Sequence, residues 1–213
     1  MQPTPTRLGS PLVGLLLIAA SLGGCNKPSR KAPKPLEGLQ WEGIALGMST
    51  EQVKARLEAL GWSTTCQTPN TLVYLDGNAL LTRWVKRADR KRAHRCDSRF
   101  TPPKTSPDGP GRLRAKTFFL DGTLRQLTVV VEWGDAALSK ELRRRWGTYQ
   151  QTDLELYLYS SRRPGRLRAL AFRRNSTTVL WLRKAKIHEL IFVSHTPAAV
   201  KALRAVASMK KNE

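Results

Sequence analysis

The chain has 213 residues and carries 37 Lys and Arg against 16 Asp and Glu, a formal net charge of +21. This length allows one ordinary domain or two small ones. Hydrophobic residues make up 40% of the chain, which excludes a disordered polycation, and no apolar run is long enough for a spanning helix in the mature protein.

The N-terminus has the organisation of an export signal. Arg7 precedes a short apolar stretch at residues 12–22. Residues 22–25 (LGGC) resemble a bacterial lipobox, in which small residues precede a cysteine. The resemblance implies cleavage before Cys25, a diacylglycerol on its thiol, and acyl chains that anchor the mature protein in a membrane. The alternative is an ordinary secretory peptide cleaved near Ala20, in which Cys25 is incidental.

A tether is predicted after the signal. Residues 26–38 (NKPSRKAPKPLEG) contain three prolines and four cations. Proline favours an extended spacer, which at ~3.1 Å per residue reaches about 40 Å. The cations either contact anionic head groups or stay solvated. In lipoboxes, Asp after the cysteine favours the inner membrane, so Asn26 favours the outer membrane. We therefore expect a signal peptide at 1–24, a lipidated tether at 25–38 and a globular domain at 39–213.

The first helix is predicted at residues 50–60. Ser49 and Gln52 have the spacing of a capping box, and Gly61 can adopt the left-handed conformation that ends a helix. Apolar residues at i, i+4 and i+7 form one face of this helix, namely Val53, Leu57 and Leu60. The pattern predicts an amphipathic helix that packs on a core.

A short motif surrounds this helix in residues 43–62. It consists of Gly47, Met48, Val53, Leu60 and Gly61, with Ser49 in the place of a threonine. It resembles the opening helix of the SmpA/OmlA-type outer-membrane lipoproteins. The resemblance implies a lipid-anchored α+β protein that supports the assembly of outer-membrane proteins. Trp62 and Ser63 stand where that family often has proline, and no functional residue is carried over.

The densest positive charge lies in residues 86–99, which carry seven Lys or Arg against two Asp and are expected to form a loop. The export signal argues against nucleic acid as its partner, and no nucleic-acid-binding motif is present. Arginine matches the geometry of phosphate and carboxylate groups. One hypothesis is that this loop binds an anionic envelope surface, and the alternative is a solvated loop. The candidate residues are Arg87, Arg90, Lys91, Arg92 and Arg95.

The two cysteines outside the lipobox, Cys66 and Cys96, are 30 residues apart. In an oxidising compartment they are expected to form a disulfide, worth about 3–4 kcal/mol in the chain-entropy model. Two alternatives remain. Cys96 and His94 are half of a metal site, or a Cys-His pair acts as a nucleophile.

The rest of the chain is predicted to form β-hairpins and two further helices. Residues 101–111 contain four Pro and two Gly and mark a loop or a boundary between possible halves at 39–100 and 112–213. Strand pairs are predicted at 71–75 with 79–87, 112–120 with 124–132, 154–158 with 166–173, and 178–183 with 187–193. Helices are predicted at 136–146, capped by Asp135, and at 197–209, capped by Thr196.

These patterns predict an α+β fold, with a largely antiparallel sheet and helices packed on it. A duplication into two similar halves is a hypothesis that the sequence similarity between them does not prove. His94, His188 and His195 lack metal-ligand spacing, and no catalytic or cofactor-binding motif is present, so no metal or cofactor is expected. We expect a non-catalytic binding or scaffold protein of the cell envelope, lipid-anchored at the periplasmic side of the outer membrane. Its partners would be the membrane and anionic envelope polymers or envelope proteins. The alternative is an envelope enzyme without a recognisable motif.

Overall fold

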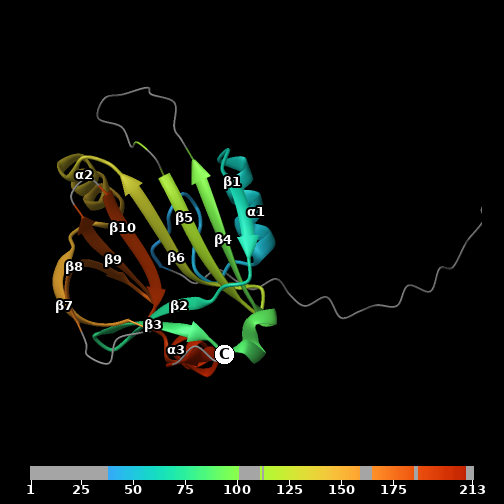
Figure 1. The fold of residues 1–213 in the computed structure, drawn as a ribbon. Helices are drawn as coiled ribbons and strands as arrows, with labels where there is room; N and C mark the ends of the chain where they lie inside the picture. The colour runs from blue at the N-terminus through green and yellow to red at the C-terminus, as the bar shows by residue number, and fades with distance from the viewer. Residues whose placement is uncertain (1–37, 101–110, 112, 159–164, 185–186, 210–213) are drawn as a thin grey trace, which may run out of the picture. The chain divides into compact units, whose positions relative to one another are not determined.

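A computed structural model describes residues 38–100, 111, 113–158, 165–184 and 187–209 (Figure 1). The expected signal peptide, Cys25 and nearly all of the tether lie outside these residues, as does most of the 101–111 segment. The described helices are α1 (Thr50–Ala59), α2 (Asp135–Trp146), α3 (Pro197–Val206) and the 3-10 helix η1 (Arg87–Arg92). The strands are β1 (Ser63–Gln67), β2 (Thr71–Asp76), β3 (Ala79–Val85), β4 (Ala93–Phe100), β5 (Leu113–Leu120), β6 (Thr123–Glu132), β7 (Gln150–Tyr157), β8 (Gly165–Arg174), β9 (Thr177–Lys184), β10 (Ile187–Ser194) and β11 (Ala207–Ser208).

All of these strands belong to one sheet. Its order is β1-β4-β5-β6-β10-β9-β8-β7-β3-β11, and β2 pairs with β3 beside this path. Neighbours are antiparallel except β3 and β7, which run parallel. The prediction of an α+β fold with a largely antiparallel sheet is therefore confirmed.

One face of the sheet carries the largest apolar core, and we call it the outer face. The chain at residues 39–46, α1 and α2 pack against this face. Leu138, Leu142 and Trp146 of α2 are buried there, at the positions that the sequence pattern predicted. Aromatic rings fill the space beneath the helix, with Trp146 edge-on to Phe172 and Phe192.

The opposite, inner face is partly covered by the β2–β3 hairpin and α3. The sheet curls, so that β2 contacts β10 in the middle of the strand order (Figure 1). The backbone N–H of Val73 donates to Oε1 of Gln126 on β6 at 3.0 Å. Leu203 and Val206 of α3 complete a second core on this side. The part of the inner face beyond β2 holds the candidate site.

Local sequence signals explain the best-defined elements. Ser49 and Gln52 form both hydrogen bonds of the capping box at α1. Gly61 has a φ of +74°, and the N–H of Trp62 reaches the carbonyl of Leu57, the pattern of a Schellman C-cap. The β5–β6 turn is Asp121-Gly122, both with positive φ, as a type I′ hairpin requires.

Several local predictions were wrong. Residues 86–99 do not form a loop, because Ala93–Phe100 is strand β4, paired on both sides by β1 and β5. Pairing satisfies its backbone, and its charged side chains keep their ends in the open part of the inner face. Asp135 lies inside α2 and pairs with Arg183, while Gly134 is the N-cap. Helix α3 ends at Val206, because the next two residues pair with β3.

Candidate functional site

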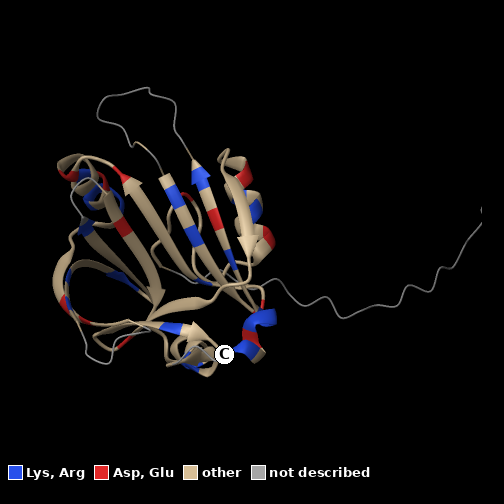
Figure 2. Cartoon of the chain, viewed as in Figure 1, with Lys and Arg blue, Asp and Glu red and all other residues tan. Residues whose placement is uncertain are grey.

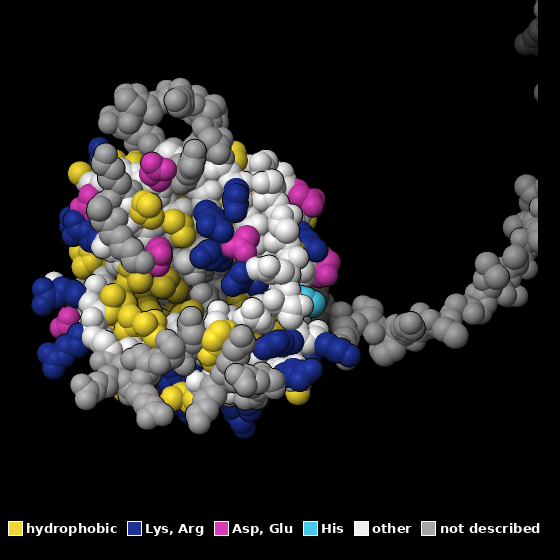
Figure 3. Space-filling model, in the orientation of Figure 1, with side chains coloured by type: hydrophobic (Ala, Val, Ile, Leu, Met, Phe, Trp, Pro, Cys, Tyr) yellow, Lys and Arg dark blue, Asp and Glu magenta, His cyan; other side chains and the backbone are white. Residues whose placement is uncertain are grey.

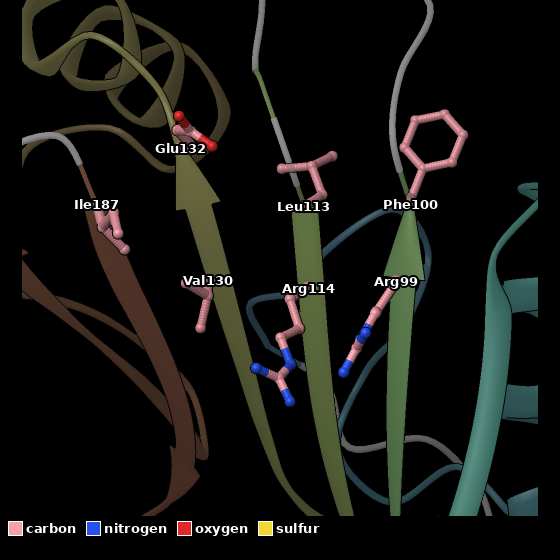
Figure 4. Close-up of a pocket in the computed structure, with 7 residues that line it drawn as sticks. All are labelled: Arg99, Phe100, Leu113, Arg114, Val130, Glu132 and Ile187. Atoms are coloured by element: carbon pink, nitrogen blue, oxygen red, sulfur yellow. The ribbon is translucent and has the colours of Figure 1, made fainter.

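Three adjoining pockets lie on the inner face of the sheet, over β1, β4, β5, β6 and β10. The largest, of about 530 Å³, is lined by Arg99, Phe100, Leu113, Arg114, Val130, Glu132 and Ile187 (Figure 4). A pocket of about 220 Å³ shares Val130 and continues towards β2. A pocket of about 380 Å³ shares Arg99 and Arg114 and continues towards β1. We call this connected surface the groove.

The groove follows from strand register. Successive side chains of a strand point to opposite faces, so every second residue of β4 and β5 faces the groove. In the β4–β5 ladder the backbone of Asp97 lies opposite that of Lys116, and Arg99 lies opposite Arg114. Lys116 in turn lies opposite Thr128 and Arg114 opposite Val130 on β6. Residues distant in sequence are thus placed in rows across the inner face.

The side of the groove formed by β4 and β5 is cationic (Figure 2). Its cations are Arg95, Arg99, Arg114 and Lys116, and its one carboxylate is Asp97. Asp97 is only 18% exposed and is shared by two arginines, with Arg95 Nε at 3.4 Å and Arg114 Nη2 at 3.7 Å. Within the described ranges, Arg99 and Lys116 have no acidic partner. This half of the groove therefore has unneutralised positive charge.

The other side of the groove is mainly apolar. Val130 and Ile187 come from β6 and β10, and Leu113 and Phe100 lie at the ends of β5 and β4 (Figure 4). Ile187 is 48% exposed and lies beside Val130, so the two residues form a small exposed apolar surface. Figure 3 shows hydrophobic side chains gathered beside basic ones on this side of the molecule. Glu132 and Glu189 add negative charge on β6 and β10.

The structure separates the five basic residues that the sequence grouped together. Arg92 pairs with Asp89 and Asp121. Arg87 and Lys91 are exposed on η1, and Arg90 is half-buried there. Arg95 alone points into the groove. Sequence reasoning missed Arg99, Arg114 and Lys116 as members of one site, although the alternation of charged residues along 95–99 and 114–116 was a usable signal.

The disulfide prediction is confirmed. Cys66 and Cys96 are bonded and lie directly opposite each other on β1 and β4, with 4.0 Å between their Cα atoms. A bonded sulfur is neither a thiolate nucleophile nor a metal ligand, so both alternatives for Cys96 were wrong. Among the residues that the structure describes, no group of three or more His, Cys, Asp or Glu side chains could hold a metal ion.

The predicted histidines lie apart from one another. His188 is fully buried on β10, where Nε2 is 3.1 Å from the carbonyl oxygen of Trp133. His195 is exposed beside the cap of α3, with Nδ1 3.1 Å from the Thr178 hydroxyl. His94 is exposed on β4. The placement of His188 agrees with a structural role.

A second charged region surrounds the C-terminal turn of α2, on the outer face. The guanidinium groups of Arg144 and Arg145 donate to Glu141 and lower its pKa to about 2. Arg145 also pairs with Glu42, next to the point where the chain enters the domain. A hydrogen bond from Arg143 to the Tyr149 hydroxyl lowers the pKa of that phenol. Here Arg144 and Arg145 are both paired with carboxylates, which distinguishes them from Arg99 in the groove.

Comparisons of this chain with protein-family models, curated proteins and solved structures find no match. In the part of the chain that the structure describes, no helix has the length and apolar character needed to cross a membrane. Function is therefore inferred from the groove and from the N-terminal sequence.

Proposed function

We propose that this chain is a lipid-anchored protein of the cell envelope with a non-catalytic binding role, and that the groove is its binding surface. The observation that carries the binding role is a concave surface with separate cationic and apolar sides. Its largest pocket, of about 530 Å³, is within the ~300–1,000 Å³ typical of ligand sites. The groove favours recognition of an anion, because its cations outnumber the Asp97 carboxylate, which already contacts two arginines.

The N-terminal sequence supports the envelope location. The lipobox at residues 22–25 would place a diacylglycerol on Cys25 and leave the domain tethered at the periplasmic face of the outer membrane. The Cys66–Cys96 disulfide is consistent with an oxidising compartment. The kinship of residues 43–62 with SmpA/OmlA lipoproteins, and an origin of 39–100 and 112–213 as two similar halves, stay hypotheses.

The anchor is tested on the native protein and on a Cys25→Ser variant. We expect the native chain to start at Cys25, to carry fatty acyl groups by mass spectrometry, and to sediment with membranes. The serine variant should lose the acyl groups and keep residues 1–24, because cleavage at a lipobox depends on the cysteine. A native chain that keeps residues 1–24, or that has no acyl groups, would contradict the proposed anchoring.

The binding role is tested with a photo-crosslinking amino acid in living cells. We place the probe at Val130, which lines two of the pockets, and in a control chain at Lys140, exposed on α2. A defined adduct at 130 that is absent at 140 is expected. If probes at 130 give no adduct, or the same adducts as 140, the groove is not the binding surface.

A further inference from the structure

The geometry points to one class of ligand: we propose that the groove binds a single anionic amphiphile, with a phosphate or carboxylate head group and one hydrocarbon chain. The head group contacts Arg99 and Arg114, and the chain lies against Val130 and Ile187. This inference rests on the proposed binding role and deepens it. It is carried by the placement of unneutralised cations directly beside an exposed apolar surface.

The head-group side has donors available. Arg99 and Arg114 lie opposite each other on neighbouring strands, and Figure 4 shows both side chains directed to the same part of the pocket. Arg114 is 3.7 Å from Asp97, which is beyond ordinary hydrogen-bond distance, so its donors are not saturated. Arg99 has no acidic partner in the described ranges. Two guanidinium forks of this kind match the oxygens of one phosphate or carboxylate.

The apolar side of the groove favours a ligand with a hydrocarbon chain over a free anion. Val130 and Ile187 expose apolar surface within the same pocket as the two arginines, and Phe100 and Leu113 border it at the strand ends, where they pack partly against the outer-face core. Covering such surface with a hydrocarbon chain removes it from water, which favours binding. Inorganic phosphate would leave it exposed.

The acidic residues of the groove restrict the ligand further. Glu132 and Glu189 lie on β6 and β10, across from the cationic strands. A polyanion that extended over the groove would bring further negative charge close to the Glu132 carboxylate. A ligand with one charged end and an uncharged chain avoids that repulsion. A planar membrane surface is also disfavoured, because it cannot reach the floor of a concave site.

The proposal is tested by calorimetric titration of the full chain carrying Cys25→Ser, which has no acyl chains of its own to occupy the groove. The probes are dodecyl phosphate and dodecanoate below their micelle concentrations, an uncharged dodecyl glycoside, inorganic phosphate, and vesicles containing phosphatidylglycerol. We expect one equivalent of dodecyl phosphate or dodecanoate to bind, at least about tenfold more tightly than the glycoside or inorganic phosphate. Equal binding of either control probe, or binding to vesicles alone, would overturn the proposal.

Two matched variants assign the binding to the groove. Arg99→Gln with Arg114→Gln should weaken dodecyl phosphate binding about tenfold or more. Arg87→Gln with Lys91→Gln removes the same charge from the exposed surface of η1 and should leave binding unchanged. An equal loss in both variants would show non-specific attraction to a protein of charge +21 and refute the site. Circular dichroism verifies that each variant is folded.

The same experiments separate the ligand class from the binding role. A specific adduct at residue 130 in cells without amphiphile binding in vitro would refute the ligand class and leave the binding role intact. Amphiphile binding that the groove variants do not change, together with no adduct at 130, would refute both. Replacing Ile187 by Asn then tests the apolar side, and it should weaken dodecyl phosphate but not inorganic phosphate.

Discussion

Individual arginines of this chain differ in how their charge is compensated. Arg145 is held by Glu141 and Glu42, whereas Arg99 has no carboxylate partner among the described residues. Paired charges on a surface contribute little to stability, because solvent screens them. Unpaired charges beside apolar surface have donors that are available to a ligand. The positions of the unpaired arginines, and not the net charge, therefore identify the groove as the candidate binding surface.

The acidic partner in α2 gives a pH-dependent prediction. The pKa of Glu141 falls from its ordinary value of 4.5 to about 2, chiefly because Arg144 donates to it. A lowered pKa stabilises the folded state fully above pH 4.5, and the effect is lost as pH falls from there to about 2. Glu141→Gln should therefore lower the free energy of unfolding by about 1 kcal/mol at neutral pH. Urea unfolding should show the gap closing by pH 2, and a gap independent of pH would contradict this cause.

A buried leucine on the same helix tests the outer-face core. Leu142 is fully buried, so Leu142→Ala should reduce the free energy of unfolding by about 2–5 kcal/mol through lost burial and the cavity left behind. Lys140→Ala, on the exposed side of α2, should change it by less than about 0.5 kcal/mol. Denaturant midpoints of the two variants measure the difference. Similar effects would mean that α2 does not pack as described.

At the scale of elements, helix α1 shows how completely local signals can define a segment. Its capping box, apolar face and Schellman end all involve residues within a few positions of one another. Strand β4 shows the opposite case. Its dense positive charge suggested a loop, yet pairing to β1 and β5 supplies hydrogen bonds along both sides of the strand. Those partners are far away in sequence, so no local pattern revealed them.

The α1 cap provides a prediction at this scale. Ser49→Ala removes the acceptor for the N–H of Gln52 and should destabilise the protein by about 1 kcal/mol. Ser49→Asp, which keeps an acceptor, should recover most of the loss. Thermal unfolding followed by circular dichroism measures both. If Ser49→Asp is as unstable as the alanine variant, the cap does not contribute in this way.

For the whole molecule, the curl of the sheet decides where the groove lies. The β2–β3 hairpin covers one end of the inner face and leaves the rest open over β4, β5, β6 and β10. Meanwhile the Cys66–Cys96 disulfide joins the edge strand β1 to β4 and secures the border of the groove. The sheet therefore combines a filled side that supports the fold with an open side suited to a ligand.

The disulfide yields the prediction at this scale. It closes a loop of 30 residues, so replacing both cysteines by Ala should lower the free energy of unfolding by about 3–4 kcal/mol, mainly through the unfolded state. Reducing the native protein should produce a similar shift in the urea midpoint, and the double variant should not respond to reductant. An unshifted midpoint in fully reduced native protein would contradict this.

Residue order alone predicted the elements whose determinants are close in sequence. The helix start at Ser49 and the hairpin turn at Asp121-Gly122 were predictable, because the interactions that define them span only a few residues. The same logic located the apolar faces of β6 and α2. The pairing of Cys66 with Cys96 followed from their number and from the export signal that the sequence predicts.

The groove could not be predicted in that way. It requires β4 and β5 to pair in one particular register, so that Arg99 meets Arg114. It also requires β10, much later in the chain, to contribute Ile187. A shift of one residue would turn these side chains to the outer face. Strand register and the curl of the sheet depend on packing between distant segments. Only the tertiary structure therefore separates the unpaired cations of the groove from those that are neutralised elsewhere.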